Sequence, residues 1–185
     1  GYACNESEEL MPLPIILGHE FSGQVVQVGP EVTHVGVGDR VSALPSMPCG
    51  SCPNCSTGRS SACSGRLAPG LVTDGFFAEY GRFTPAADIF KLPEEVSYEA
   101  AALLEPFAVS LNAVDRSGFK IGQKTAVLGP GPIGLFAAQI LRAAGAATVM
   151  MVGAQGDEKR LETAERLGAD LSVNIADDDP VKRAK

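Results

Sequence analysis

The sequence predicts a protein in two parts: a small all-β part, followed by an α/β part with a parallel sheet. Up to about Pro93, short apolar segments are separated by glycine and proline, which is typical of strands joined by tight turns in a small barrel or sandwich. After Pro93, short apolar segments alternate with helical ones in the order β-α-β-α-β. That order favours parallel strands connected by helices.

Four segments of the all-β part are expected to be strands. Residues 21–28 alternate around three valines and end at a Gly-Pro pair, and a short apolar stretch follows G-D-R-V at residues 38–41. Residues 76–83 and 89–92 supply the other two strands. Residues 48–65 interrupt them as a long loop with little periodicity.

The α/β part begins with helices. Ser97 offers an N-cap hydroxyl to a helix expected over residues 98–104, Glu105-Pro106 interrupts it, and helical spacing resumes over 107–114. The elements expected next are strands over 125–128, 148–152 and 171–175, and helices over 133–144 and 157–167. We place the domain boundary after residue 108, which gives a first domain of residues 1–108 and a second of 109–185.

The composition limits the classes of function. The chain has 185 residues, of which 45% are hydrophobic and 20% charged, and its formal net charge is −7. These values are those of a soluble globular protein, and no apolar run reaches the roughly 18 residues of a membrane span. The acidic balance argues against a nucleic-acid partner. Nothing resembles a secretory leader, so we expect a cytoplasmic protein with a small-molecule partner and no membrane partner.

Four cysteines stand in the pattern C-x2-C-x2-C-x7-C, which is typical of a zinc site. Thiolates two residues apart on a tight turn can point at one ion about 2.3 Å away, and four of them form a closed tetrahedral shell. A pair of disulfides is the alternative, but this spacing is awkward for a bridge. A closed shell leaves no position open for catalysis, so the zinc is expected to be structural. Its ligands are Cys49, Cys52, Cys55 and Cys63.

A phosphate-binding loop is predicted from G-x-G-x-x-G at residues 129–134, directly after an apolar strand and at the start of a helix. The first glycine permits a sharp turn, the second lets the backbone approach a pyrophosphate, and the third lets the helix pack on the strand. A glycine-rich turn without a ligand is the alternative. The residues expected at a dinucleotide are Gly129, Gly131, Pro132, Ile133, Gly134 and, at the end of the second strand, Gly153.

The carboxylate that usually follows such a loop is missing. NAD-binding folds place an acid about 20 residues on, at the end of the second strand, where it bonds the ribose 2′-OH. This chain has Gly153 there. Asp157 and Glu158 are expected to belong to the next helix, and Lys159 or Arg160 could attract a 2′-phosphate. Both NAD and NADP therefore stay open as cofactors.

A functional role for His19 is indicated by the motifs around it and not by the residue alone. A lone histidine is usually a core or surface residue, and His34, on a turn, is expected to be exposed. However, G-H-E at residues 18–20 is followed in order by G-D-R-V, the four-cysteine loop, L-E-P at 104–106 and G-x-G-x-x-G. This ordered set resembles the zinc-dependent medium-chain dehydrogenases, the family of alcohol, polyol and threonine dehydrogenases. The polyol and threonine branch is the more similar one, because Glu105 stands where other alcohol dehydrogenases have cysteine.

The resemblance implies a GroES-like β-barrel catalytic domain followed by a Rossmann domain with a doubly wound parallel sheet. His19 would bind a catalytic zinc, Glu20 would bind or support it, and Glu105 would be a third ligand or hold the zinc-bound water. The implied reaction is hydride transfer between a primary or secondary alcohol, or a polyol, and NAD or NADP, in a homodimer or homotetramer. A zinc-stabilised nucleotide-binding scaffold without a catalytic zinc is the alternative. A zinc-ribbon protein that binds nucleic acid conflicts with the acidic charge.

The resemblance is incomplete at both ends. Family members carry C-G-[ST]-D well before G-H-E, whereas Cys4 lacks the residues that should follow it and is expected to be an ordinary thiol. A doubly wound sheet of this kind has about six strands, of which the sequence predicts only the first half. We therefore expect an internal fragment of roughly half an enzyme, inactive by itself.

Overall fold

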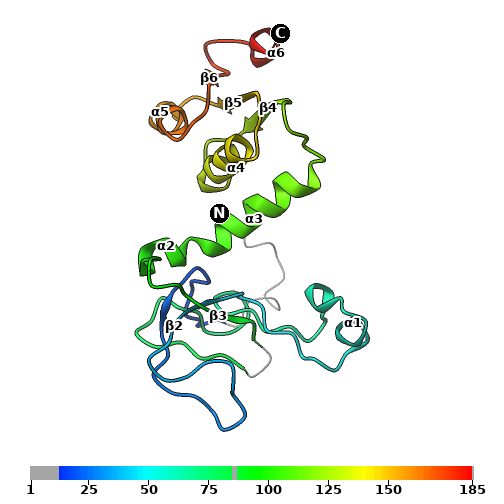
Figure 1. Ribbon diagram of the computed structural model, residues 1–185, viewed down its shortest axis with the longest axis vertical. Helices are drawn as coiled ribbons and strands as arrows, with labels where there is room; N and C mark the ends of the chain where they lie inside the picture. The colour runs from blue at the N-terminus through cyan, green and yellow to red at the C-terminus, as the bar shows by residue number, and fades with distance from the viewer. Residues whose placement is uncertain (1–12, 85–86, 185) are drawn as a thin grey trace. The chain divides into compact units, whose positions relative to one another are not determined.

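The computed structural model describes residues 13–84 and 87–184 (Figure 1), which divide into two units. The first unit ends at Glu105 and the second begins at Pro106, within the helix α3 (Leu104–Arg116). The boundary expected after residue 108 falls in the same helix. None of the helices in the described ranges is long and apolar enough to cross a membrane. Cys4 lies outside the described residues.

The first unit contains a small antiparallel sheet in the order β1-β2-β3. Its strands are β1 (Gly23–Gln24), β2 (Arg40–Ala43) and β3 (Ile89–Lys91). The central strand, β2, is paired on both sides: Arg40 lies opposite Gln24, and Val41 lies opposite Lys91. Val41 and Ala43 are buried, so β2 supplies the apolar residues on which the neighbouring segments rest.

The strand expected over residues 76–83 is wrong, and the one expected over 21–28 is reduced to β1. A Cβ on Gly81 would lie 2.2 Å from the Phe76 ring, so the chain bends back across this ring. An extended strand would instead separate these two residues by roughly 16 Å. The bend lets the Phe76 ring stack on Phe21 at 3.9 Å and on Phe83 at 5.1 Å between centroids. Aromatic packing therefore replaces strand pairing here.

The loop between β2 and β3 carries two short helical turns, α1 (Pro53–Ser56) and η1 (Ser60–Ala62). The Asn54 side-chain amide donates to the Ala62 carbonyl oxygen at 2.6 Å and ties the two turns together. The long excursion predicted for residues 48–65 is thus an ordered loop that presents the four cysteines.

Two consecutive helices follow β3. The first is α2 (Tyr98–Ala102), whose N-cap residue Ser97 accepts a hydrogen bond from the Ala100 amide at 3.1 Å, as predicted. The interruption expected at Glu105-Pro106 lies instead at Leu103, the C-cap of α2. Pro106 belongs to the first turn of α3, where a residue without an N–H leaves no helical hydrogen bond unmade. Proline here starts a helix instead of ending one.

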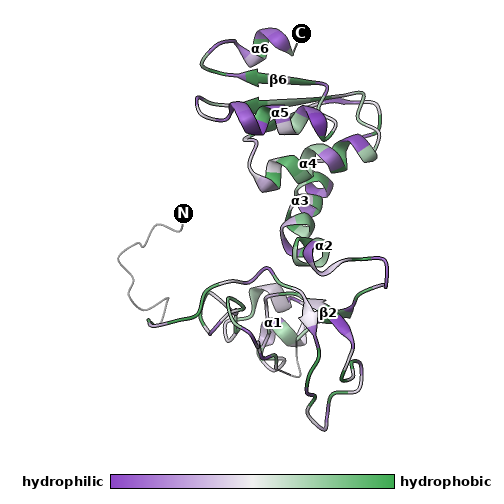
Figure 2. Ribbon diagram, turned by 90° about the vertical axis from the view of Figure 1, so that its left-hand side faces the viewer, coloured by the Kyte–Doolittle hydropathy of each residue, from purple (hydrophilic) through white to green (hydrophobic). Residues whose placement is uncertain are grey.

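The second unit is a parallel sheet in the order β4-β5-β6 with helices in its connections. This confirms the predicted β-α-β-α-β order. The elements are β4 (Lys124–Leu128), α4 (Pro132–Ala143), β5 (Thr148–Gly153), α5 (Glu158–Arg166), β6 (Leu171–Asn174) and the short α6 (Pro180–Arg183). On this sheet α4 is mainly hydrophobic and α5 mainly hydrophilic (Figure 2).

The core of the second unit forms on one face of β5. Val149 and Met151 are fully buried and pack in one cluster with Ala138 of α4 and with Leu161 and Ala164 of α5. The alternate residues of β5 pack with β6 on the opposite face. Such burial of both faces is expected for a central parallel strand.

Candidate functional site

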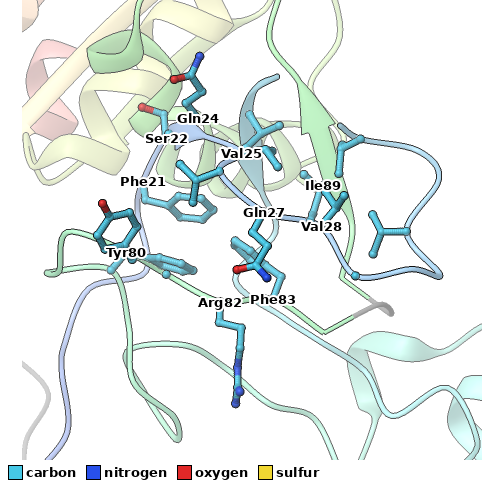
Figure 3. A pocket seen from close by; sticks show the side chains of 18 of the residues that line it. Phe21, Ser22, Gln24, Val25, Gln27, Val28, Tyr80, Arg82, Phe83 and Ile89 are labelled. Carbon is cyan, nitrogen blue, oxygen red and sulfur yellow. The ribbon is translucent and has the colours of Figure 1, made fainter. Parts of the chain in front are cut away.

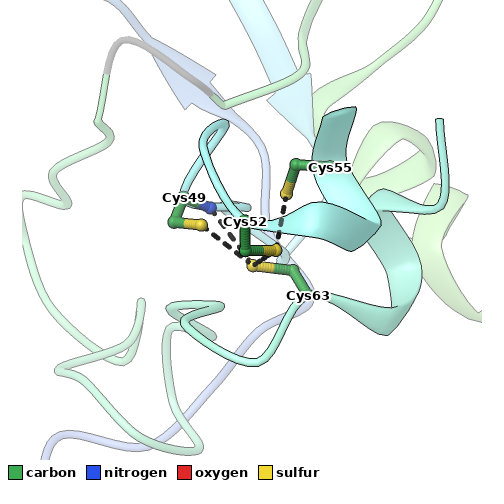
Figure 4. Close-up of side chains that lie close together, drawn as sticks. All are labelled: Cys49, Cys52, Cys55 and Cys63. Atoms are coloured by element: carbon green, nitrogen blue, oxygen red, sulfur yellow. Dashed lines mark hydrogen bonds between the residues drawn. The ribbon is translucent and has the colours of Figure 1, made fainter. Parts of the chain in front are cut away.

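The four cysteine sulfurs converge on one point (Figure 4). Sγ of Cys52 lies 3.5 Å from that of Cys55 and 3.8 Å from that of Cys63, and Sγ of Cys63 lies 3.5 Å from that of Cys49. Four sulfurs bound tetrahedrally at about 2.3 Å from zinc are about 3.8 Å apart. All four thiols are free, so the disulfide alternative does not describe this loop. The donor set fits a zinc ion.

Backbone amides prepare one of these thiols for a metal. The N–H groups of Ser51 and Cys52 point at the Cys49 sulfur and lower the pKa of this thiol to about 6. Desolvation and the neighbouring Cys52 sulfur raise the pKa of Cys55 to about 12. Thiolates this close repel each other, so a divalent cation is needed to hold all four in the charged form.

A second cluster brings His19, Glu20 and Glu105 together. One ligand atom from each lies within 4.8 Å of the others, and His19 and Glu105 are half-buried. Desolvation raises the pKa of the Glu105 carboxyl; the charge of His19 opposes this shift and that of Glu20 adds to it. A nitrogen and carboxylate oxygens are ligands that zinc accepts, and three protein ligands leave a coordination position open for a reactant.

A close backbone contact positions His19. Gly18 has φ of +96°, and a Cβ on Gly70 or Gly75 would lie 2.4 or 2.2 Å from its carbonyl oxygen. The same oxygen accepts from the amide of Phe76 at 2.9 Å. Glycine is therefore needed on both sides of this contact. Sequence analysis did not single out Gly70 and Gly75, because turn glycines in a loop give no sign of what they approach.

The phosphate loop has the geometry that a dinucleotide requires. Gly129 has φ of +95° directly after β4, and Gly131 is the N-cap of α4 with nothing within 4 Å of an added Cβ. A Cβ on Gly134 would lie 2.0 Å from the Gly129 carbonyl oxygen. Pro132 and Ile133 open α4, whose first-turn N–H groups are available to an anion.

A buried hydroxyl that sequence analysis missed anchors the start of α4. Ser110 of α3 is fully buried, and its Oγ lies 2.9 Å from the Pro106 carbonyl oxygen and 3.0 Å from that of Ile133. Its hydroxyl can thus donate to the first turn of the helix that carries the phosphate loop. A serine within an apolar helical stretch was the available signal.

The loop after β5 differs from the expectation. A Cβ on Gly153 would lie 3.1 Å from the Asp157 Cβ and 3.0 Å from Leu161, so there is little room for a larger side chain. Asp157 turns back over the loop: its Oδ2 accepts from the Ala154 amide at 3.0 Å, and its Oδ1 pairs with Arg160 at 3.1 Å. The Asp157 carboxylate therefore lies against the residue that directly follows β5.

A hollow of about 970 Å³ lies elsewhere in the first unit (Figure 3). Phe21, Val25, Tyr80, Phe83 and Ile89 are among the residues that line it, and the candidate zinc ligands are not. His34, at its edge, is exposed, as expected. The chemistry of the chain thus gathers at the two clusters and the phosphate loop.

Family comparison agrees with this set of sites. Residues 2–94 match the model of the alcohol dehydrogenase GroES-like domain, and residues 132–185 match that of the zinc-binding dehydrogenases. The chain belongs to the zinc-binding alcohol dehydrogenase family. The predicted succession of a GroES-like domain and a Rossmann-like domain is thereby confirmed.

Among curated proteins, this zinc-binding dehydrogenase chain is similar to L-threonine 3-dehydrogenases. It is 38% identical to the one from Shewanella woodyi over 94% of the chain and 50% of that protein. It is 42% identical to the one from Bacillus licheniformis over 91% of the chain and 48% of that protein. The chain thus spans about half the length of the curated relatives it matches.

Solved structures of zinc-binding dehydrogenases have the same fold. A Sinorhizobium meliloti protein bound to NADP has a TM-score of 0.84 and 38% identity, covering 92% of this chain and 49% of that one. Galactitol-1-phosphate dehydrogenase from Escherichia coli has a TM-score of 0.81 and 32% identity, with coverage of 92% and 49%. The alcohol dehydrogenase of Aeropyrum pernix has a TM-score of 0.78 and 35% identity, with coverage of 93% and 51%.

Cys52→Ser is expected to lower the zinc content by one ion per chain and to lower the melting temperature, because it removes one of the four converging sulfurs. Zinc by mass spectrometry and thermal melting provide the measurements. Ser61→Ala, an exposed change in the same loop, is the control and should leave both unchanged. Wild-type zinc content in Cys52→Ser would rule out this metal site.

Gly134→Ala is expected to reduce the free energy of unfolding by about 1–3 kcal/mol, because the new methyl group would collide with the Gly129 carbonyl oxygen. Gly131→Ala should fold like the wild type but bind dinucleotide more weakly, since its methyl group would point into the space a pyrophosphate enters. Denaturant unfolding and calorimetric titration with NADH distinguish the two. Equal stability of both variants would contradict the different roles assigned to these glycines.

Proposed function

We propose that this chain is part of a zinc-dependent dehydrogenase that transfers a hydride between an alcohol or polyol and NAD or NADP. The observation that carries the proposal is the convergence of His19, Glu20 and Glu105. In a chain that also has a four-cysteine site and a phosphate loop, such an incomplete ligand set supports a catalytic zinc in place of a second structural one. The scaffold alternative requires no such convergence.

The candidate zinc ligands and the phosphate loop would have different roles in the reaction. His19 would offer a neutral imidazole nitrogen, while Glu20 and Glu105 would supply oxygen ligands or hold a water molecule. A zinc ion at this cluster would lower the pKa of a bound alcohol so that the alkoxide forms near neutral pH. The phosphate loop and the start of α4 would hold the pyrophosphate, so that the nicotinamide accepts the hydride as the alcohol becomes a carbonyl compound.

The relatives suggest the substrate class. L-threonine and galactitol 1-phosphate, named in the relatives' descriptions, both carry secondary alcohols beside other polar groups. Glu105, where other alcohol dehydrogenases have cysteine, supports the same branch of the family. We infer an alcohol or polyol substrate of this kind, and propose a cytoplasmic homodimer or homotetramer with no membrane or nucleic-acid partner.

In the complete protein to which this chain contributes, His19→Ala is expected to remove the catalytic zinc and abolish turnover, while dinucleotide affinity changes less than about twofold, since the phosphate loop belongs to the other unit. Glu105→Gln should weaken zinc retention or slow turnover. His34→Ala is the matched control, because it alters an exposed histidine of the same unit. Zinc content, turnover and NADH titration form the test. A single zinc per wild-type chain, unchanged in His19→Ala, would favour the scaffold alternative.

The cofactor preference is expected to depend on Asp157. Its carboxylate would repel a 2′-phosphate at the end of β5, so Asp157→Asn should shift preference toward NADP(H) by on the order of 1 kcal/mol, about fivefold. Asparagine at position 157 can still accept from the Ala154 amide, so the loop should keep its conformation. The control is Glu162→Gln, which removes one charge from the exposed face of α5. Titrations with ADP-ribose and its 2′-phosphorylated form measure the shift. An unchanged ratio in Asp157→Asn would mean that another residue reads the ribose.

A further inference from the structure

We propose that Arg40 is a positioning residue for the candidate zinc cluster, acting through the turn that leads to Glu105. The proposal rests on the proposed function, because it concerns the metal site of the same reaction. In the sequence, Arg40 is distinguished only by its place in G-D-R-V, one of the motifs that carry the resemblance.

A single guanidinium group binds most of the turn between β3 and α2. Nη1 of Arg40 donates to the carbonyl oxygens of Pro93 at 3.3 Å and Glu94 at 3.2 Å, and Nη2 donates to that of Val96. The guanidinium carbon also lies 4.6 Å from the centroid of the Tyr98 ring. Arg40 therefore holds both the carbonyl groups of the turn and the first residue of α2.

The backbone of Arg40 is equally fixed. It lies opposite Gln24 of β1, and its carbonyl oxygen accepts from the Leu92 amide at 2.8 Å. A second tie starts from the segment that directly follows Glu20: the Ser22 hydroxyl donates to the Tyr98 carbonyl oxygen at 2.6 Å. The Ser22 hydrogen bond connects the segment that carries His19 to the first residue of α2, and Arg40 connects β2 to the same residue.

The path from this anchor to the metal cluster is short. Tyr98 opens α2, only Leu103 separates α2 from α3, and Glu105 lies in the first turn of α3. A helix has a fixed rise per residue, so a shift of Tyr98 would be passed along α2 to the Leu103 junction, beyond which Glu105 lies in the next turn. The ligand atoms of Glu105, His19 and Glu20 lie within 4.8 Å of one another, so a displaced α3 would move the Glu105 carboxylate away from the other two.

The arrangement requires arginine. A planar guanidinium with five donors can bond several carbonyl oxygens at once and stack on an aromatic ring, whereas a lysine ammonium offers one nitrogen on a flexible stem. Arg40→Lys keeps the charge but should lose most of the contacts to the turn. The variant therefore separates the geometry of the fork from its charge.

The test measures metal binding in the full chain. Arg40→Lys is expected to weaken zinc binding at the cluster of His19, Glu20 and Glu105 by about ten- to hundredfold, as loss of an outer partner of a metal ligand typically does. Competition with a chelator gives the affinity of each site. After cobalt substitution, the thiolate charge-transfer absorption of the four-cysteine site should match that of the wild type. Ser22→Ala should produce a smaller effect in the same direction, without changing any charge.

Two controls distinguish positioning from general stability. Lys91→Gln removes the 2.7 Å ion pair to Asp39 in the same sheet and should leave both zinc affinities unchanged. If Arg40 acts through Glu105, adding Arg40→Lys to Glu105→Gln should cost little more than Glu105→Gln alone.

Three outcomes would overturn the proposal. Arg40→Lys could bind both zinc ions as the wild type does, its effect could add fully to that of Glu105→Gln, or the four-cysteine signal could be lost with it. In each case the wild type still binds two zinc ions, and the proposed function stands. A wild-type chain that binds one zinc, unaffected by His19→Ala, would overturn both.

Discussion

The candidate catalytic cluster depends on holding two distant segments of the chain against the same small sheet. On one side, the Gly18 carbonyl oxygen is fixed by the Phe76 amide and by the close approach of Gly70 and Gly75. On the other side, the turn that leads to Glu105 is fixed by Arg40. A shift of one residue along an extended chain moves a side chain by about 3.3 Å and turns it to the other face. Ligands supplied in this way require fixed backbone on both sides.

The two metal clusters illustrate different ways of building a site. The four cysteines lie within one loop, so their convergence needs only local turns, such as that at Gly50 with φ of +76°. The ion and the loop are expected to order each other. His19 and Glu105 come from opposite ends of the first unit, so their approach is a consequence of the fold. The first cluster is thus expected to depend on a metal ion, and the second on the fold of the first unit.

Features that depend on neighbouring residues could be predicted from the sequence, whereas contacts between distant residues could not. The four-cysteine spacing and the phosphate loop could be predicted, because each is a short motif whose geometry follows from neighbouring residues. His19 could be proposed only from the order of several motifs. The roles of Gly70, Ser110 and Arg40 could not be foreseen, since each depends on a partner far away in the sequence.

Two errors in the prediction have the same physical origin. The strand expected over residues 76–83 gave way to aromatic stacking around Phe76, which pattern alone does not reveal. Asp157 was expected within a helix, yet it is the N-cap residue of α5, and its side chain turns back to accept from the Ala154 amide. In both cases the secondary structure was predicted from the order of residue types, which does not show the side-chain contacts that compete with regular backbone structure. Such contacts are decided by tertiary packing.

The low pKa of Cys49 has a consequence for handling the protein. A thiolate that persists at neutral pH is the reactive form toward oxidants, and here its sulfur lies 3.5 Å from that of Cys63. While zinc binds these sulfurs, their lone pairs are engaged and oxidation is slow. Once a chelator or acid removes the ion, air can join the pair and prevent the metal from returning. A zinc ion at these sulfurs would thus also protect the loop from oxidation, and metal-free protein would have to be kept under a reductant.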